Sequence, residues 1–292
     1  MEAYENAIEI NNITKKYDGF TLKGVSFVVP KGCIMGFIGQ NGAGKSTTIN
    51  SLLRITNINE GEIKLLGMDH VKDEEEIKKH LAVVFDEMPY HNSFNAIDMG
   101  RIFKGLYPEW DMEIYESYLE RLELPRKKKI GEFSKGMKMK LQIACALSHH
   151  AKLLIMDEAT TGLDPVVRDE ILHLFMEYLQ DGESSILMSS HITSDIEKIA
   201  DMVTFIHKGQ ILLSGYKDEI VECHGIIRCD KEQVKEIDSE DIVSIRINNF
   251  GAEVLVNDKE KATRSYSGVV IDNASLDDIM LFYVHKDVKE WS

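Results

Sequence analysis

The sequence predicts an α/β fold with a parallel sheet, an antiparallel β portion before it, a helical insertion within it and a small α+β appendage after it. Three observations support this prediction. Short apolar runs, such as residues 34–38 and 153–156, are typical of central strands in a parallel sheet. Segments with apolar residues at helical spacing lie between such runs. Residues 7–30 alternate in polarity, which indicates two antiparallel strands joined near Asp18 and Gly19.

After the antiparallel pair, the first half of the chain alternates between strands and helices. Residues 47–54 are predicted to open a helix, because Ile49 and Leu52 fall on one face of it. Later apolar residues, among them Tyr115 and Leu119, again recur at helical spacing. The elements predicted between the first helix and residue 150 are strands at 61–66 and 81–85 and a helical stretch over about 94–150.

The second half of the chain continues the same alternation. Asp164 before Pro165 predicts a helix start, because aspartate caps helices and proline suits the first helical position. A Lys208-Gly209 turn between two short apolar runs predicts a hairpin. The predicted elements are strands at 153–156 and 185–189, a helix at 192–200, and hairpin strands at 202–207 and 211–214.

Beyond about residue 219 the sequence pattern changes to short predicted strands separated by acidic segments. Strands are predicted at 226–229, 242–247 and 253–256, followed by an amphipathic helix over 275–284 that Ser275 caps. This stretch has neither an internal repeat nor a recognisable catalytic constellation. We therefore predict two domains, residues 1–221 and 222–292, and the sequence leaves a structural or a regulatory role open for the second.

Composition narrows the class of protein. The chain has 292 residues, 43% of them hydrophobic and 28% charged, as in ordinary globular proteins. Its net charge of -15 argues against nucleic acid as a partner and against direct adhesion to an anionic membrane. The basic run at 126–129 follows a proline, and a solvated loop is favoured there over a binding patch.

Targeting signals and cysteines point to the cytosol. No stretch approaches the roughly 18 consecutive apolar residues of a spanning helix. Residues 1–5 are acidic at Glu2 and Glu5 and differ from a signal peptide. The four cysteines lack metal-like spacing, which favours reduced thiols. We expect a cytoplasmic protein.

Residues 39–46 carry the strongest chemical signal in the chain. They fit the pattern G-x-x-x-x-G-K-[ST] and lie between an apolar strand and a helix, as that loop requires. Glycines let the backbone wrap a triphosphate, and N–H groups at the helix start point at the anion. Lys45 is expected to reach the β- and γ-phosphates, and the Ser46 hydroxyl to bind Mg²⁺. The sequence thus predicts binding of a nucleoside triphosphate.

Two carboxylates follow the apolar run at 153–156. Asp157 and Glu158 would lie at the carboxyl edge of a parallel sheet, where α/β folds bind ligands. Asp157 is expected to hold Mg²⁺, directly or through water, and Glu158 to polarise a water for attack on the γ-phosphate. An Asp-Glu pair alone is equally typical of a surface turn, and only the phosphate loop makes it specific.

A second helix start resembles an anion site. Ser134 and Gly136 precede a helix through Leu141, and alone they indicate an ordinary N-cap. The order of motifs along the chain nevertheless favours an anion site over an ordinary N-cap. A known series of motifs occurs here in sequence: the phosphate loop, this helix start, Asp157-Glu158, Asp164 and His191.

On these landmarks, residues 7 to about 220 resemble the ATP-binding subunit of an ABC transporter. The resemblance implies an α/β phosphate-loop NTPase core with an antiparallel β subdomain and a helical ABC signature subdomain over about 88–150. It implies that Ser134 and Gly136 form the signature, Asp164 the D-loop and His191 the switch histidine. The Walker A residues that would bind nucleotide are Gly39, Asn41, Gly42, Gly44, Lys45, Ser46 and Thr47.

Two interpretations are available for the residue at the expected adenine-binding position. Tyr17 occupies the place of the aromatic residue that stacks on adenine in this family. The other interpretation of Tyr17 is a half-buried strand residue, and stacking is the favoured one of the two.

The resemblance also implies an assembly. Two ATPase chains, identical or related, would form a head-to-tail dimer in which each ATP lies between Walker A of one chain and the Ser134 segment of the other. The helical region would grip an integral-membrane permease, which places the chain peripherally on the inner face of the cell membrane. Within the family, the chain is similar to bacterial ABC-2-type exporter subunits, including the YtrB-like group.

Three positions depart from the family pattern. Asp86 occupies the place of a glutamine that senses the γ-phosphate and Mg²⁺. A carboxylate can still ligate Mg²⁺, but it adds negative charge beside the triphosphate. Lys135 and Met137 occur where glycine and glutamine are typical. Lys135 would either add charge at the phosphate of the other chain or point into water.

The expected function is an ATPase that drives export through a separately encoded permease. The alternative is a soluble, non-transport ABC ATPase acting in regulation, translation or DNA repair. Ribosome-associated members carry two ATPase units and DNA-repair members carry long coiled coils, and this chain shows neither pattern. A third interpretation, a sensor with a decayed ATPase, conflicts with the presence of Lys45, Glu158 and His191.

Overall fold

The computed structural model describes residues 4–266 and 268–285. The chain divides into two compact units, Met1–Ile211 (unit 1) and Leu212–Ser292 (unit 2). The predicted domain boundary between residues 221 and 222 falls inside unit 2 and stays a prediction about where an independent domain ends. The first three residues of the acidic N-terminus, residue 267 and the last seven residues lie outside the described residues.

An antiparallel sheet opens unit 1, in the strand order β2-β1-β4-β5. The predicted pair joined near Asp18 is present: Tyr17 and Phe20 face each other across the turn, and the alternating side of β1 that carries Ile8 and Ile10 is buried. The strands are β1 (Asn6–Tyr17), β2 (Phe20–Pro30), β4 (Glu60–Leu65) and β5 (Met68–Asp69).

A second sheet forms the centre of unit 1, in the order β10-β9-β3-β8-β7-β6. The strands from β9 to β6 are parallel to their neighbours, and most of their residues are buried, as is typical of central strands in a parallel sheet. They are β3 (Ile34–Ile38), β6 (Leu81–Phe85), β7 (Leu153–Asp157), β8 (Ser185–Ser190) and β9 (Met202–His207), with β10 (Gln210–Tyr216) crossing the unit boundary.

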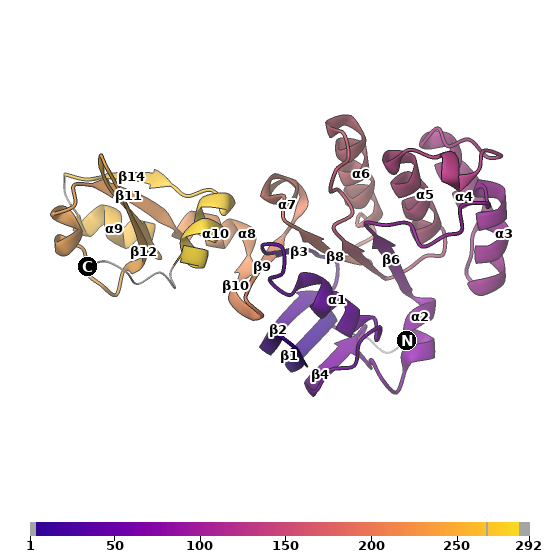
Figure 1. Cartoon of the computed structure of the whole chain (residues 1–292), viewed down its shortest axis with the longest axis horizontal. Helices are drawn as coiled ribbons and strands as arrows, with labels where there is room; N and C mark the ends of the chain where they lie inside the picture. The colour runs from indigo at the N-terminus through magenta and orange to yellow at the C-terminus, as the bar shows by residue number, and fades with distance from the viewer. Residues whose placement is uncertain (1–3, 267, 286–292) are drawn as a thin grey trace. The chain divides into compact units, whose positions relative to one another are not determined.

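The helices of unit 1 connect these strands (Figure 1). In the view of Figure 1, α6 and α7 lie above the central sheet, whereas α1 and the antiparallel sheet lie below it. The predicted helical stretch consists of α3, α4 and α5. The bounds are α1 (Lys45–Leu52), α2 (Glu74–Lys79), α3 (Ala96–Leu106), α4 (Met112–Arg121), α5 (Lys135–Leu147), α6 (Pro165–Tyr178) and α7 (Thr193–Ile199), with a 3₁₀ turn at Ile130–Glu132.

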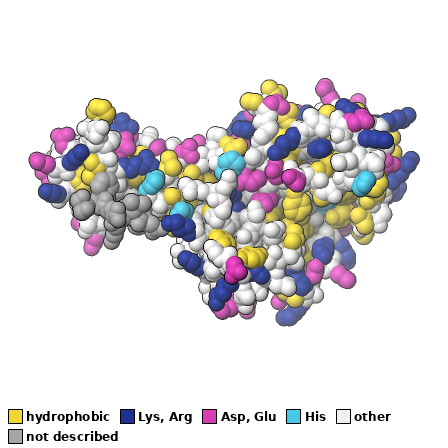
Figure 2. Space-filling view, viewed as in Figure 1, with side chains coloured by type: hydrophobic (Ala, Val, Ile, Leu, Met, Phe, Trp, Pro, Cys, Tyr) yellow, Lys and Arg dark blue, Asp and Glu magenta, His cyan; other side chains and the backbone are white. Residues whose placement is uncertain are grey.

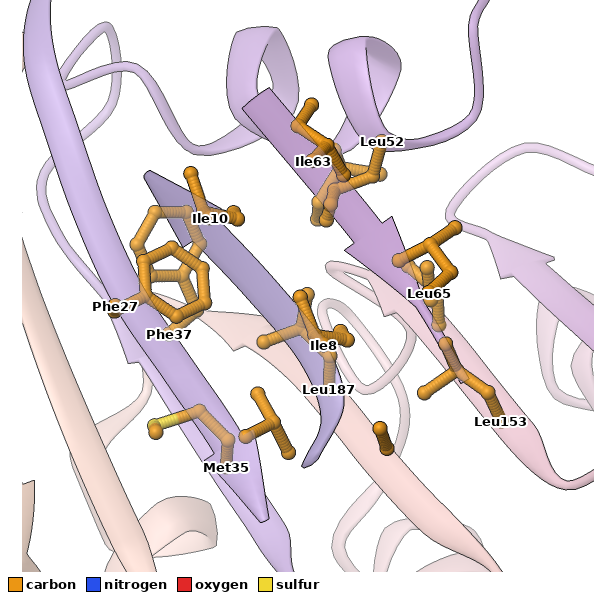
Figure 3. Packing of buried hydrophobic residues seen from close by; sticks show 14 of the residues in the cluster. Ile8, Ile10, Phe27, Met35, Phe37, Leu52, Ile63, Leu65, Leu153 and Leu187 are labelled. Carbon is orange, nitrogen blue, oxygen red and sulfur yellow. The ribbon is translucent and has the colours of Figure 1, made fainter. Parts of the chain in front are cut away.

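The core of unit 1 lies between its two sheets. Phe27 of the antiparallel sheet and Phe37 of the central sheet have ring centroids 5.2 Å apart, and both are buried (Figure 3). Ala43 just before α1 and Leu52 at its end both belong to the same cluster, so the helix is packed against the core at both of its ends. The loop that precedes Lys45 is therefore held by the core on both sides.

Unit 2 is a small α+β structure with a four-stranded antiparallel sheet in the order β12-β13-β11-β14. Its own core contains Ile227, Val254 and Val256. The predicted strands and the final helix are present, and Ser275 caps that helix by accepting from the Asp278 N–H. The elements are α8 (Lys217–Cys223), β11 (Gly225–Cys229), a 3₁₀ turn at Gln233–Glu236, β12 (Ile242–Asn248), β13 (Gly251–Val256), α9 (Lys259–Ser265), β14 (Val270–Asn273) and α10 (Leu276–His285).

Some short elements were not predicted from sequence. These are the polar or brief segments β5, α2, α8, α9 and β14, which have too few residues to show a clear period. Over residues 4–266 and 268–285, no helix combines the length and the hydrophobicity needed to cross a membrane.

Candidate nucleotide-binding site

Four predicted site residues directly follow four neighbouring strands of the central sheet. Gly39 follows β3, His191 follows β8, Glu158 follows β7 and Asp86 follows β6. The register aligns the strand ends: Ile38 pairs with Ser190, Ser189 with Asp157, and Asp157 with Phe85. Because these strands are parallel, the four residues emerge at one edge of the sheet.

The phosphate loop is built as its sequence predicts. Gly44 has φ of 118°, and a Cβ on it would lie 2.8 Å from Leu22 Cδ2, so both its conformation and its packing require glycine. Lys45 opens α1 with a side chain that is only 5% exposed, and its Nζ donates to the Gly39 carbonyl at 2.6 Å. Ser46 and Gly42 are exposed. The loop thus has a fixed backbone and accessible groups at the helix start.

Glu158 lies at the centre of a polar cluster. Its Oε2 accepts hydrogen bonds from the Thr161 hydroxyl at 2.8 Å and from His191 Nδ1 at 2.6 Å. Its Oε1 is buried 3.1 Å from Lys45 Nζ without hydrogen-bond geometry. The cluster therefore joins the loop after β3, the segment after β7 and the residue after β8.

The charge of Glu158 follows from this environment. Burial acts to raise its pKa, but the Thr161 hydroxyl, the Lys45 ammonium and the His191 ring together lower the pKa below its usual value. Its backbone has φ of 54°, an uncommon left-handed conformation. The Glu158 N–H donates to Ser189 Oγ at 3.1 Å, which helps hold that conformation. Glu158 is thus a fixed carboxylate with one oxygen free of hydrogen bonds to the described residues.

The Asp157 carboxylate is oriented from the neighbouring strand. Ser189 Oγ donates to Asp157 Oδ1 at 2.6 Å across the β7–β8 pair. Neither Ser189 nor Thr161 was singled out from sequence. Thr161 follows Glu158 by three residues in a turn, a spacing that could have suggested the contact, whereas the partnership of Ser189 depends on strand order.

The second helix start is also present. Ser134 caps α5, with its Oγ accepting from the Met137 N–H at 3.2 Å. Asp164 likewise caps α6 by accepting from Val167 N–H. Lys135 was expected either to act on another chain's phosphate or to point into water. Instead its Nζ donates to Asp86 Oδ1 at 2.6 Å within the same chain.

Tyr17 lies at the end of β1 and is 46% exposed. Its hydroxyl contacts Thr56 Oγ1 at 3.4 Å, and Lys15 Nζ lies 5.1 Å from the ring centroid. An exposed ring at a strand end is available for stacking, so the adenine role stays a prediction.

Comparisons with known proteins address the family. A family model described as ABC transporter matches residues 22–161, a range that includes the phosphate loop, Asp86, Ser134 and Glu158. The bacitracin transport ATP-binding protein BcrA of Bacillus licheniformis is 34% identical over 208 residues, which cover 70% of this chain and 68% of the relative. The chain belongs to the ABC transporter family.

Other similarities agree with this assignment. The ABC transporter ATP-binding protein YtrB of Bacillus subtilis (strain 168) is 29% identical over 216 residues, covering 74% of each chain. A solved structure described as the ATP binding subunit of an ABC transporter has a TM-score of 0.67 and 28% identity over 73% of this chain and 91% of that one. The predicted family, α/β phosphate-loop fold and ATPase class are confirmed. The individual residue roles stay predictions.

Proposed function

We propose that this ABC ATPase is the ATP-hydrolysing subunit of an exporter and that it drives a separately encoded integral-membrane permease through head-to-tail dimerisation. The observation that carries the proposal is the polar cluster around Glu158, which joins the phosphate-loop lysine to His191 at the carboxyl edge of the sheet. These are the groups that phosphoryl transfer to water needs in one place.

The chemistry follows from the positions of these groups. Lys45 and the N–H groups of α1 would hold the β- and γ-phosphates of ATP. The lowered pKa of Glu158 keeps it ionised, and one of its oxygens has no hydrogen bond to the described residues, so this carboxylate would accept the proton of the attacking water. His191, hydrogen-bonded to the other oxygen of Glu158, would orient that carboxylate and contact the γ-phosphate.

Magnesium fits the donors at this edge of the sheet. Ser46 offers a hydroxyl, Asp157 a carboxylate held by Ser189, and Asp86 a carboxylate after the next strand. Hard oxygen donors of this kind suit Mg²⁺, which would neutralise charge on the phosphates.

The dimer is supported by the start of α5. Gly136 has no positive φ, and a Cβ on it would make ordinary contact with Val167 at 3.5 Å. Its own chain therefore does not require glycine there. Close approach of another molecule would require it, and in this proposal that molecule is the ATP bound by the partner subunit.

The permease would dock on an apolar groove of unit 1. The groove has a volume of about 560 Å³ and is bordered by β6, α2 and the end of α3. Figure 2 shows hydrophobic side chains gathered between the helical region and the part of unit 1 that carries α2. Ile55 and Leu106 line it and are exposed large hydrophobic residues, which is typical of an interaction surface.

The direction and place of action come from the relatives. BcrA and SrtF are described as bacitracin and lantibiotic transport ATP-binding proteins, and a further relative as a Nod factor export ATP-binding protein, which supports a role in transport and favours export. The chain would then lie on the inner face of the cell membrane through that permease. A soluble ABC ATPase without a permease remains the alternative.

The test uses substitutions in the groove. Leu106→Asp and Ile55→Asp should abolish copurification of an integral-membrane protein from detergent-solubilised membranes, because they place charge in an apolar contact. ATP binding by the same variants should be unchanged. Val28→Asp, at an exposed apolar position of β2, is the matched control and should copurify normally. Equal recovery with all three variants would contradict docking at the groove, and no membrane partner for the unaltered chain would favour the alternative.

A further inference from the structure

The Mg²⁺ role proposed for Asp86 does not explain why its carboxylate is paired with Lys135. Asp86 directly follows β6, beside the strand that ends in Asp157. Lys135 begins α5, and its Nζ donates to Asp86 Oδ1 at 2.6 Å. In the part of the chain that the structure describes, Lys135 is the charged partner found for Asp86.

A second contact fixes this pair in place. The Gln142 side chain is buried and exchanges two hydrogen bonds with the Phe85 backbone, at 3.2 Å from the Phe85 N–H and 3.1 Å to the Phe85 carbonyl. Lys135 and Gln142 are seven residues apart on α5, so they lie on one face of the helix. One helix face therefore holds both the last residue of β6 and the residue that follows it.

The Lys135 side chain also reaches the segment after β7. A Cβ added to Gly162 would lie 3.4 Å from Lys135 Nζ. Gly162 lies four residues after Glu158, between that carboxylate and the Asp164 cap of α6. The ammonium group thus lies beside two of the loops that leave the carboxyl edge of the sheet.

Stability alone does not account for this pair. Both side chains are exposed, 45% for Lys135 and 43% for Asp86, and ion pairs at such sites contribute little to folding. The position of Asp86 at the nucleotide-binding edge makes its negative charge relevant to nucleotide binding. An unpaired carboxylate at this edge would repel the phosphates of a nucleotide bound by the same chain, and a nearby ammonium reduces that repulsion.

We propose that Lys135 is a positioning residue that neutralises and orients Asp86, so that a carboxylate can stand beside the triphosphate of its own chain. The inference rests on the proposed function, because it assumes that nucleotide binds at the phosphate loop. It assigns Lys135 to the nucleotide of the same subunit and not to that of the partner.

The test measures binding of a fluorescent ATP analogue at protein concentrations low enough to keep the chain monomeric. Lys135→Met should raise the dissociation constant roughly fivefold without Mg²⁺, because a full negative charge is uncovered near the phosphates. The increase should be smaller with Mg²⁺, since a metal ion held by Asp86 would neutralise the same carboxylate. Lys135→Arg should bind as the unaltered protein does, because it keeps the charge.

The decisive comparison is made in the Asp86→Asn background. There Lys135→Met should leave the dissociation constant unchanged, because no carboxylate remains to be neutralised. Arg126→Ala breaks a pair of the same 2.6 Å length with Glu116 in the helical region and is the matched control, which should bind normally. Melting temperatures without nucleotide should be the same for Lys135→Met and Arg126→Ala.

Three outcomes would overturn the inference about Lys135, and a further one would overturn the proposed function. Equal losses in both backgrounds would mean that Lys135 acts independently of Asp86. A loss seen only at concentrations that allow dimers would assign Lys135 to the partner's nucleotide. A Lys135→Met protein that does not fold would assign it to stability. If the unaltered chain fails to bind, or if Lys45→Ala binds as well as it does, the proposed function fails instead.

Discussion

The helix starts at Gly44 and at Ser134 differ in what surrounds them. At α1, Gly44 is enclosed by side chains of its own chain, and Lys45 is buried and paired with Glu158. At α5, Ser134 is exposed, and a Cβ on Gly136 would have room. Contacts within the chain therefore require glycine at the start of α1, which we call the enclosed half. The described contacts of the chain do not require glycine at the start of α5, which we call the exposed half. The difference agrees with the proposed dimer, in which each chain contributes two unlike halves of a site.

The largest effect is expected at the enclosed half. Glu158→Gln removes the carboxylate that would accept a proton, and general-base catalysis contributes roughly 10²- to 10⁴-fold to rate. Turnover of ATP should fall by about that factor, while ATP binding persists. Steady-state phosphate release measures the first, and size-exclusion chromatography with ATP should show a trapped dimer. A variant that stays monomeric with ATP would contradict the sandwich arrangement.

A substitution at the exposed half should separate folding from assembly. Gly136→Ala should stabilise the folded chain by about 0.4–1 kcal/mol, because alanine loses less backbone entropy in a helix. The added methyl group should nevertheless prevent the ATP-dependent dimer, because it occupies the surface that the partner's nucleotide approaches. Thermal melting and chromatography test the two parts. A stabilised variant that still dimerises with ATP would show that the exposed half is not an ATP contact.

The same glycine-to-alanine substitution at the start of α1 is the control for Gly136→Ala. Gly44→Ala should destabilise the chain, since its φ of 118° and its 2.8 Å approach to Leu22 exclude a side chain. Opposite signs for the two glycine substitutions are the outcome that the comparison requires.

The smallest effect concerns pH and the far end of α5. His149 lies just beyond this helix, buried against the Leu81 carbonyl and the Tyr107 ring, and burial lowers its pKa below the ordinary value. The unfolded chain then binds a proton more readily than the folded one, so stability falls as pH decreases through about 6.5 toward the lowered pKa. The free energy of unfolding should be lower at pH 5.5 than at pH 7.5.

His149→Gln should reduce this pH dependence without abolishing it, because burial also lowers the pKa of His70 and His224. His150→Gln, at the exposed neighbouring position, should change the slope less than His149→Gln does, because His150 acts on the buried ring only through its charge. Denaturant titrations at the two pH values measure the slopes. The prediction is wrong if both variants show the slope of the unaltered chain.

Much of the nucleotide site could be predicted from sequence because its signals are local. The phosphate loop, the apolar strands and the caps at Ser134 and Asp164 each depend on a few consecutive residues. The contact between Lys135 and Asp86 could not be predicted, because 49 positions separate the two residues and no periodicity links them. The Ser189 contact with Asp157 likewise depends on which strands become neighbours. Short polar elements such as α2 could not be predicted, because they have too few residues to show a helical period.

The face of α5 that carries Lys135 and Gln142 has a thermodynamic consequence. Ser134, proposed to bind the partner's ATP, is adjacent in sequence to Lys135, which holds the residue beside the chain's own ATP. Any free energy by which one nucleotide shifts this helix start must change the affinity of the other by the same factor. Two chains joined in this way would bind their two nucleotides cooperatively, and the sign of that cooperativity would be the same measured from either site.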